Sequence, residues 1–359
     1  MKKLTFLLLC AACSFAKAQQ TENLIIITTD GFRWHEVFEG MDPVIANDKA
    51  FFQGDSLGIY KTFWADNVDA RRAKLLPFFW NTIAKHGQLY GNRNLGNKVN
   101  VTNPYWFSYP GYSEIMCGFA DTAINSNNYK PNPNITLPEF LNNQPKLKGK
   151  VAAFGAWDAF NRILNEERSG IPVVAAFDEC GGKTPNANQQ LINKMLRTSH
   201  REWAEECYDV FTHHEALEEL KTTKPRVLYI SYGETDEFAH GRQYKYYLQA
   251  ANQFDAFVNE IWNQVQSDPQ YKNKTTLFIT TDHGRGDVTK SQWTSHGAAI
   301  KNADEIWFAV MGPNTPATGE MKTEMQTYQK QFAQTMAKLM GYTFKAEHPI
   351  GEEVRSAIK

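Results

Sequence analysis

The chain lacks the features that mark membrane-spanning and nucleic-acid-binding proteins. After the first eighteen residues, no apolar stretch approaches the eighteen or more residues that a transmembrane helix needs. Positive charge is not in excess, since 38 Lys and Arg stand against 39 Asp and Glu. Non-specific nucleic-acid binding needs clustered positive charge. The sequence therefore predicts no stable membrane insertion and no nucleic-acid partner.

Cysteine is also scarce. Of five cysteines, two lie in the first eighteen residues, which leaves Cys117, Cys180 and Cys207. None has the Cys-x-x-Cys spacing of a zinc or redox site. Cys180 with Cys207 is a plausible disulfide because Cys117 lies in an apolar helical run, and three free thiols are the alternative.

The amino terminus has the pattern of an export signal. Lys2 and Lys3 precede an apolar run over Leu4–Phe15, and Ala16-Lys17-Ala18 fits the small-x-small cleavage rule. We expect residues 1–18 to be a signal peptide and 19–359 a single domain, periplasmic or secreted. Cleavage would reduce the basic residues from 38 to 35 against 39 acids, a net charge of −4.

Apolar, β-branched runs alternate with helical patterns through the chain. This alternation predicts an α/β fold, a three-layer α/β/α sandwich with a mostly parallel central sheet. The expected strands are Leu24–Thr29, Val151–Gly155, Val227–Tyr232, Thr276–Thr281 and Ile306–Met311. The expected helices are Arg71–His86, Pro110–Gly118, Leu191–Tyr208, Arg242–Gln266 and Glu324–Met340.

Acidic residues follow three of these strands. Asp30 ends the first strand, Asp236 follows the third, and Asp282 follows the fourth. Open α/β sheets place their ligand sites at the carboxyl ends of the strands, where loops converge. We therefore expect these carboxylates to meet.

Imidazoles accompany the acids. In Asp282-His283-Gly284 the chain beyond the strand can direct both side chains to one ion, although the same tripeptide is common in turns. If a helix begins near Asp236, then Asp236 and His240 share one face, whereas the alternative is Asp236 as a helix cap. His296 lies in a turn-like stretch and, taken alone, is equally a buried structural histidine. Three carboxylates and three imidazoles suit two divalent ions.

Ser108 is the candidate nucleophile. It lies just before Pro110, and a proline at the first helical position after a hydroxyl residue is typical of a helix start. A helix amino terminus stabilises anions, and a metal ion could activate the serine oxygen. A purely capping role is the alternative for Ser108, and Ser113 is a second possible nucleophile within the expected helix.

The ordered set resembles the alkaline phosphatase superfamily, particularly its nucleotide pyrophosphatase/phosphodiesterase-like branch, from about Leu24 to Pro313. The resemblance implies two divalent metal ions, most commonly zinc, and a phosphoserine intermediate on Ser108. It implies that one ion is held by Asp30, Ser108, Asp282 and His283. It implies that the other ion is held by Asp236, His240 and His296.

Some family positions differ. The branch usually has Thr as nucleophile, and its following Asn-His is Gly111-Tyr112 here. We match the family's substrate-positioning Asn to Asn127 and take Arg285 as the candidate cation for phosphate oxygens. Trp157, after the second strand, is a candidate pocket residue. The alternatives are a loop residue without a role for Asn127, a core residue for Trp157 and a solvent-facing side chain for Arg285.

The expected function is hydrolysis of a small-molecule phosphate mono- or diester. A sulfatase is the nearest rival, because Ser108-Tyr109-Pro110 is similar to the sulfatase Ser/Cys-x-Pro-x-Arg element, with Tyr112 in place of the Arg. The histidine-rich ligand set suits zinc better than the calcium of sulfatases. A non-catalytic metal-binding relative is the third possibility. Oligomeric state and natural substrate are not readable from the sequence.

Overall fold

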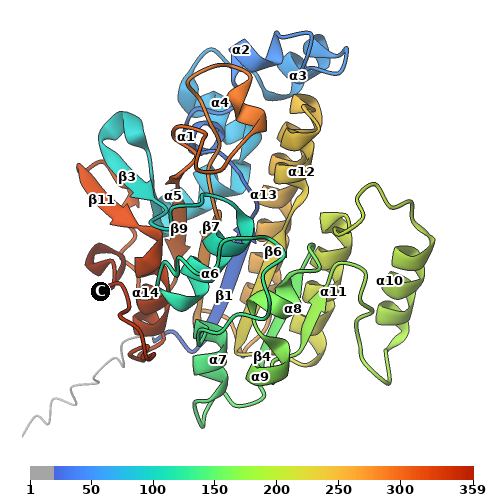
Figure 1. Cartoon of the computed structure of the whole chain (residues 1–359), viewed down its shortest axis with the longest axis vertical. Helices are drawn as coiled ribbons and strands as arrows, with labels where there is room; N and C mark the ends of the chain where they lie inside the picture. Colours follow the sequence, from blue (N-terminus) through green and yellow to red (C-terminus); the bar gives the residue numbers. More distant parts are fainter. Residues whose placement is uncertain (1–19) are drawn as a thin grey trace, which may run out of the picture.

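The computed structural model describes residues 20–359. The expected signal peptide lies outside these residues. A sheet of eight strands runs through the molecule with helices on both faces (Figure 1). Its strands, in spatial order, are β10 (Gly319–Glu320), β2 (Gln88–Tyr90), β9 (Phe308–Met311), β7 (Thr275–Thr280), β1 (Asn23–Thr29), β6 (Val227–Tyr232), β4 (Val151–Gly155) and β5 (Val173–Ala175).

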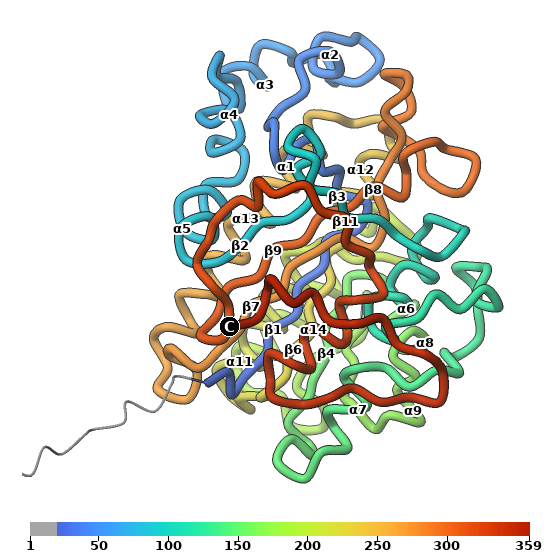
Figure 2. The backbone as a smooth tube through the Cα atoms, turned by 90° about the vertical axis from the view of Figure 1, so that its left-hand side faces the viewer, coloured from blue at the N-terminus to red at the C-terminus, as the bar shows by residue number. Residues whose placement is uncertain are grey.

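Most neighbouring strands of this sheet are parallel. Only β9 is antiparallel to its two neighbours, β2 and β7. The mostly parallel sheet and the three-layer α/β/α fold class are thus confirmed. A smaller sheet lies beside it (Figure 2), with the order β11 (Met325–Tyr328), β3 (Asn97–Asn100) and β8 (Glu305–Ile306).

Strand β1 is at the centre because its side chains are apolar on both faces. Ile25 and Ile27 pack on one side with α11 (Asp209–Thr222) and α13 (Tyr244–Ser267). Leu24 and Ile26 pack on the other side with the helices α6 (Ser108–Cys117), α7 (Leu137–Asn142) and α14 (Phe332–Leu339). Successive side chains of a strand point to opposite faces, so a continuous apolar run indicates burial on both.

The remaining helices are short. They are α1 (Trp34–Glu39), α2 (Pro43–Ala46), α3 (Ser56–Phe63), α4 (Val68–Leu75), α5 (Ala84–His86), α8 (Phe160–Ile163), α9 (Glu166–Ser169), α10 (Ala187–Thr198) and α12 (Glu234–His240). Single turns of other helix types are η1 (Phe79–Ile83), η2 (Arg93–Leu95), η3 (Gln292–Thr294), η4 (Gln329–Gln331) and η5 (Arg355–Ala357). In the described residues no helix is both long enough and apolar enough to cross a bilayer.

Two expected helices are interrupted. The helix expected over Arg71–His86 breaks before Pro77, because proline lacks an N–H and restricts the residue before it. The helix expected over Leu191–Tyr208 ends at Thr198, and a loop follows.

Two further expectations near the carboxyl terminus are also wrong. In the segment Glu324–Met340, β11 and η4 precede α14, since residues 325–328 pair in parallel with β3 and tertiary pairing overrides local helix propensity. The strand expected over Ile306–Met311 is divided into β8 and β9, which belong to different sheets.

All three described cysteines are buried and free. The Cys180–Cys207 disulfide, the pairing considered plausible from the sequence, is therefore not formed. The Cys180 thiol lies 3.2 Å from Oδ1 of Asn193, and the Cys207 thiol lies 3.4 Å from the hydroxyl of Thr212. Each sulfur is thus accommodated by a polar neighbour of its own.

Candidate metal centre and nucleophile

Two acids and a histidine reach the same edge of the sheet because the strands that carry them, β1 and β7, are parallel neighbours. Asp30 directly follows β1, and its N–H donates to the Tyr232 carbonyl at the end of β6. Asp282 and His283 follow β7 on the other side of β1. The ligand atoms of Asp30, Asp282 and His283 all lie within 4.8 Å of one another, and the three residues are buried. We call this set the first triad.

A second triad is formed by Asp236, His240 and His296, again with ligand atoms within 4.8 Å. Asp236 is not a helix cap, because Gly233 caps α12 and Asp236 lies in the first turn. The i, i+4 spacing places His240 Nε2 3.0 Å from Oδ2 of Asp236. His296, which follows η3, brings its Nε2 to within 2.9 Å of Nε2 of His240.

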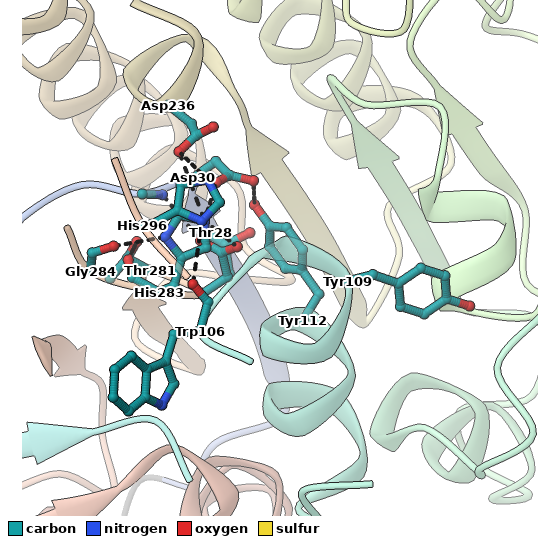
Figure 3. Close-up of polar contacts among 12 residues, drawn as sticks. Thr28, Asp30, Trp106, Tyr109, Tyr112, Asp236, Thr281, His283, Gly284 and His296 are labelled. Carbon is teal, nitrogen blue, oxygen red and sulfur yellow. Dashed lines mark hydrogen bonds and ion pairs between the residues drawn. The ribbon is translucent and has the colours of Figure 1, made fainter. Parts of the chain in front are cut away.

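The two triads adjoin each other (Figure 3). His283 Nε2 lies 3.8 Å from Oδ1 of Asp236, and the His283 and His296 rings stack with centroids 3.9 Å apart. Gly31 allows this close approach, since a Cβ there would lie 2.3 Å from Oδ1 of Asp236. Gly31 also has φ +57°, a conformation that favours glycine.

The first triad has the donor chemistry of a cation site. Oδ1 of Asp30, Oδ2 of Asp282 and Nε2 of His283 are buried and have no hydrogen-bond partner. Leaving buried polar atoms unsatisfied is costly, and a bound divalent ion would satisfy all three. The residues therefore fit a metal ion.

Electrostatics point the same way. Burial and the charge of Asp236 raise the pKa of Asp30, while burial and the charge of Asp30 raise the pKa of Asp282 well above its usual value. Burial disfavours the charged imidazole, but Asp282 and Asp30 outweigh it and raise the pKa of His283 to about 9. Unneutralised carboxylates thus dominate the first triad, and a cation would relieve their repulsion.

The second triad is different because an arginine faces it. Burial alone would raise the pKa of Asp236, but Arg285, His240 and His296 outweigh it and hold the value well below the usual range. Burial and the charge of His283 keep the pKa of His296 well below its ordinary value. His296 is therefore neutral at physiological pH, the form in which an imidazole binds metals.

Backbone carbonyls orient two of the imidazoles. His283 Nδ1 lies 2.9 Å from the Gly284 carbonyl, and His296 Nδ1 lies 3.3 Å from the Trp106 carbonyl. A carbonyl can only accept, so Nδ1 carries the hydrogen in both rings. The Nε2 atoms are then the nitrogens that face the triads and can bind an ion, in His283 once an ion displaces its Nε2 proton, which is the arrangement common in metal-ligating histidines.

The nucleophile segment meets both triads. The Trp106 carbonyl contacts His296 of the second triad. Gly111 and Tyr112, which follow Ser108 in α6, contact the first triad. The Tyr112 hydroxyl donates to Oδ2 of Asp30 over 2.9 Å, and a Cβ on Gly111 would lie 2.5 Å from the Asp282 carbonyl. Ser108 lies between these contacts in the chain.

Ser108 is the first residue of α6, so the helix begins earlier than expected and Pro110 occupies its third position rather than its first. Ser108 does not act as the helix cap. Instead, the Asn127 side chain accepts the Tyr109 N–H at 3.0 Å. The Ser108 hydroxyl has no hydrogen-bond partner among the described residues, and Ser108 is 6% exposed. Ser113, by contrast, is fixed inside the helix, where its hydroxyl accepts from Asn132 over 3.0 Å.

Of the three candidate substrate-binding residues, Asn127 lies beside Ser108, whereas Trp157 and Arg285 are buried and contact other protein groups. Asn127 lies at the amino terminus of α6, beside Ser108. Trp157 follows β4, is buried, and directs its indole N–H toward Glu205 Oε2 at 3.5 Å. Arg285 is 2% exposed, and its guanidinium donates to the Gly31, Trp293 and Asp236 carbonyls and to the Asp236 carboxylate. Arg285 thus holds Asp236 and the loop after β1.

Several residues of the site were not recognised from the sequence. Tyr112 and Gly111 were noted only as departures from a family pattern, yet they contact the first triad. Gln329 of η4 donates to the Asp282 carbonyl over 2.6 Å, from a segment that had been expected to be helical. Gly233, which caps α12, and the Trp106 carbonyl contribute backbone atoms only, so no side chain in the sequence indicated their roles.

Comparison with known protein families gives a match over much of the chain. The family model described as "Metalloenzyme superfamily" matches residues 142–343, more than half of the chain. No curated protein sequence matches.

Solved structures show the same fold at low sequence identity. Alkaline phosphatase PafA has a TM-score of 0.63 at 8% identity, covering 95% of this chain and 99% of that one. The lipoteichoic acid synthase LtaP from Listeria monocytogenes has a TM-score of 0.55 at 12% identity, covering 95% and 77%. BT1596, a 2-O GAG sulfatase, has a TM-score of 0.56 at 13% identity, covering 93% and 73%.

Proposed function

Because the chain belongs to the metalloenzyme superfamily, with an alkaline phosphatase-like fold, we propose that it is an exported phosphoesterase with two zinc ions. In this proposal Ser108 is the nucleophile, and a phosphoserine forms during hydrolysis of a small-molecule phosphate ester. The observation that carries the proposal is the position of Ser108 between contacts to two adjoining triads.

Zinc is the proposed ion because the donors are carboxylates and imidazoles. Calcium prefers six to eight oxygen ligands, whereas zinc accepts about four ligands that include nitrogen. Asp30, Asp282 and His283 would hold one ion together with the Ser108 oxygen, and the second triad would hold the other. When bound, the ions would supply Lewis-acid activation and neutralise phosphoryl charge.

The proposed reaction consists of two successive displacements at phosphorus. The Ser108 oxygen attacks phosphorus, and the bond from phosphorus to the alcohol oxygen breaks. The proton that the serine hydroxyl loses is balanced by the proton that the departing alcohol oxygen takes up. Water then attacks the phosphoserine, the bond from phosphorus to the serine oxygen breaks, and a proton from the water restores the serine hydroxyl. In the first turn of α6, Pro110 has no N–H, and the Tyr109 and Gly111 N–H groups donate to the Asn127 side chain and the Phe107 carbonyl, so the Ser108 N–H is the one left to hold a phosphoryl oxygen. Asn127 fixes this terminus by accepting the Tyr109 N–H.

A diester is the proposed first choice of substrate. A diester carries one negative charge near neutral pH and a monoester about two, so the monoester needs more positive charge beside the ions. The two arginines near the site are already engaged, Arg285 by Asp236 and Arg162 by the carbonyls of Asn127 and Tyr129. A site with few free cations favours the substrate with less charge.

A sulfatase remains the second candidate because one structure with this fold is a sulfatase. Against it, the position that carries Arg in the sulfatase element is Tyr112, whose hydroxyl is bonded to Asp30. The histidine-containing triads also suit zinc better than calcium.

Parallel assays of the zinc-loaded protein with bis-p-nitrophenyl phosphate, p-nitrophenyl phosphate and p-nitrophenyl sulfate test the proposal. We expect phosphate ester hydrolysis, with the diester preferred. Ser108→Ala should abolish turnover while both ions remain bound, and acid quenching should trap phosphate on Ser108 in the parent protein. Ser113→Ala is the matched control and should keep its activity. Undiminished activity of Ser108→Ala would reject the assignment.

A further inference from the structure

Glu114 is a buried carboxylate in the helix that carries Ser108, and the proposed reaction gives it no role. It lies in α6, which begins at Ser108, and it is 0% exposed. A carboxylate in the core is costly unless hydrogen-bond donors surround it. The segments that supply those donors therefore show what Glu114 holds together.

Five donor groups from two segments outside α6 reach Glu114. The N–H and the hydroxyl of Thr102 donate to Oε1 over 3.0 and 2.5 Å. The N–H and the side-chain amide of Asn103 donate to Oε2 over 2.7 and 3.0 Å. The Lys330 N–H donates to Oε1 over 3.0 Å. Both carboxylate oxygens thus accept, and they join α6 to the loop before it and to η4.

The loop before α6 holds His296. Oδ1 of Asn103 accepts the N–H groups of Tyr105 and Trp106 at 3.0 and 3.1 Å. The Trp106 carbonyl in turn accepts the Nδ1 hydrogen of His296 at 3.3 Å (Figure 3). A chain of hydrogen bonds therefore leads from Glu114 through Asn103 and Trp106 to a ligand of the second triad.

Trp106 has a backbone conformation that its neighbours must enforce. Its φ is +53°, in the left-handed region, where a bulky side chain is rare. Such a conformation is strained and persists only where surrounding contacts fix it. Asn103 provides one of these contacts at the Trp106 N–H, while the Trp106 carbonyl faces His296. The strain lies directly before the nucleophile segment, which indicates a functional constraint on this loop.

The segment at η4 holds the first triad. Gln329 precedes Lys330, is 0% exposed, and donates from Nε2 to the Asp282 carbonyl over 2.6 Å. The same carbonyl packs against Gly111 of α6, where a Cβ would lie 2.5 Å from it. Because the Lys330 N–H is bonded to Glu114, Gln329 is held beside α6. Glu114 is thus connected to a ligand of the first triad as well.

Another buried carboxylate of the chain lacks this double connection. Asp255 of α13 is 1% exposed and accepts the N–H groups of Phe78 and Phe79 at 2.7 and 2.9 Å. Its two donors are consecutive residues of one segment, so Asp255 holds that segment to α13. Glu114 resembles Asp255 in burial and in accepting backbone N–H groups, but it joins two segments that each contact a different triad.

We propose that Glu114 is a positioning residue of the reaction, which fixes a ligand of each ion relative to Ser108 through two chains of hydrogen bonds. This inference rests on the proposed function of the site. Glu114 neither transfers a proton nor binds the substrate. Its loss should displace His296 and Asp282 together, whereas loss of one chain should affect one ion only.

Zinc affinity, measured separately at the two triads, tests this inference. Glu114→Gln keeps the side-chain shape but places an amide N–H group against backbone groups that only donate. We expect it to weaken zinc binding at both triads by about tenfold. Asn103→Ala should weaken binding at the second triad only, and Gln329→Met at the first only. Titration against a competing chelator, with cobalt spectroscopy to tell the two sites apart, measures the affinities.

Asp255→Asn is the matched control, because it makes the same change from carboxylate to amide at a buried acceptor of backbone N–H groups. Its unfolding free energy should change, but zinc affinity at both triads should not. Glu114→Asp keeps the charge and shortens the side chain, so it provides the same test if Glu114→Gln does not fold. Unchanged affinity at both triads in a folded Glu114 variant would overturn the inference. Loss at one triad only would overturn the claim that Glu114 serves both.

Activity measurements separate this inference from the proposed function. Hydrolysis of bis-p-nitrophenyl phosphate by Glu114→Gln should fall at limiting zinc and recover at saturating zinc, which general structural damage would not do. An activity loss with unchanged zinc affinities would show that Glu114 is only structural. If both affinities fall but the parent protein hydrolyses no phosphate ester, the proposed function is wrong and the link between Glu114 and the two triads stands.

Discussion

The Tyr112 hydroxyl donates a 2.9 Å hydrogen bond to Oδ2 of Asp30, linking the nucleophile helix to the first triad. The bond leaves Oδ1 of Asp30, which has no hydrogen-bond partner and lies 3.2 Å from Nε2 of His283, as the oxygen available to an ion. Loss of a residue that orients a metal ligand in this way typically costs about tenfold to a hundredfold in metal affinity. The helix that carries Ser108 and the first triad are thus positioned together.

The first prediction follows from this bond. Tyr112→Phe should lower metal affinity at the first triad about tenfold to a hundredfold, because Asp30 loses the donor that orients it. Tyr109→Phe is the matched control, since the Tyr109 hydroxyl donates to the Lys130 carbonyl and points away from the triads (Figure 3). Zinc titration against a competing chelator measures both. Equal zinc affinity in the two variants would contradict the role given to Tyr112.

Removal of single imidazoles should reveal the grouping of the ligands. His240→Ala and His296→Ala should each deplete the same ion, because both residues belong to the second triad. His283→Ala should deplete the other ion. Elemental analysis combined with spectroscopy of cobalt-substituted protein distinguishes the two sites. Loss of different ions from His240→Ala and His296→Ala would show that the second triad is not a unit.

Close backbone approach makes Gly111 sensitive to a single methyl group. A Cβ at this position would lie 2.5 Å from the Asp282 carbonyl, a backbone atom that cannot rotate away. Gly111→Ala should therefore reduce stability by about 1–3 kcal/mol and displace the start of α6. Gly241→Ala is the control, because its Cβ would meet nothing nearer than 3.4 Å. Denaturant unfolding compares the two, and equal stability would contradict the close packing.

Asp255 should make stability depend on pH. It accepts the N–H groups of Phe78 and Phe79, and burial raises its pKa from 3.8 to about 7. At Asp255 the folded state therefore binds more protons than the unfolded state between these values, so the contribution of Asp255 to stability is greatest below pH 3.8 and is lost as pH rises through 7. Asp255→Asn should flatten this part of the profile, measured as unfolding free energy against pH. An unchanged slope in the variant would show that Asp255 is not its source.

The sequence was sufficient to predict the site residues that directly follow predicted strands. Asp30, Asp236 and Asp282 follow apolar runs, and parallel strands bring their carboxyl ends together, so the meeting of the three acids could be expected. The i, i+4 pair of Asp236 and His240 could also be read from spacing alone.

Contacts made by tertiary packing could not be read in the same way. Arg285, which follows Asp282-His283-Gly284, was taken as the candidate cation for phosphate oxygens, and in the fold its guanidinium is buried against Asp236 and the loop after β1. Residues 325–328 have no strong local preference for a strand and form one only because β3 lies beside them.

Anomalous diffraction at the zinc edge, from crystals of the zinc-loaded protein, tests the central claim most directly. Two separate peaks are predicted, one within each triad, with the Ser108 oxygen in contact with at least one of them. A single peak, or two peaks that both lie beyond reach of the Ser108 hydroxyl, would contradict a two-metal site built around this serine.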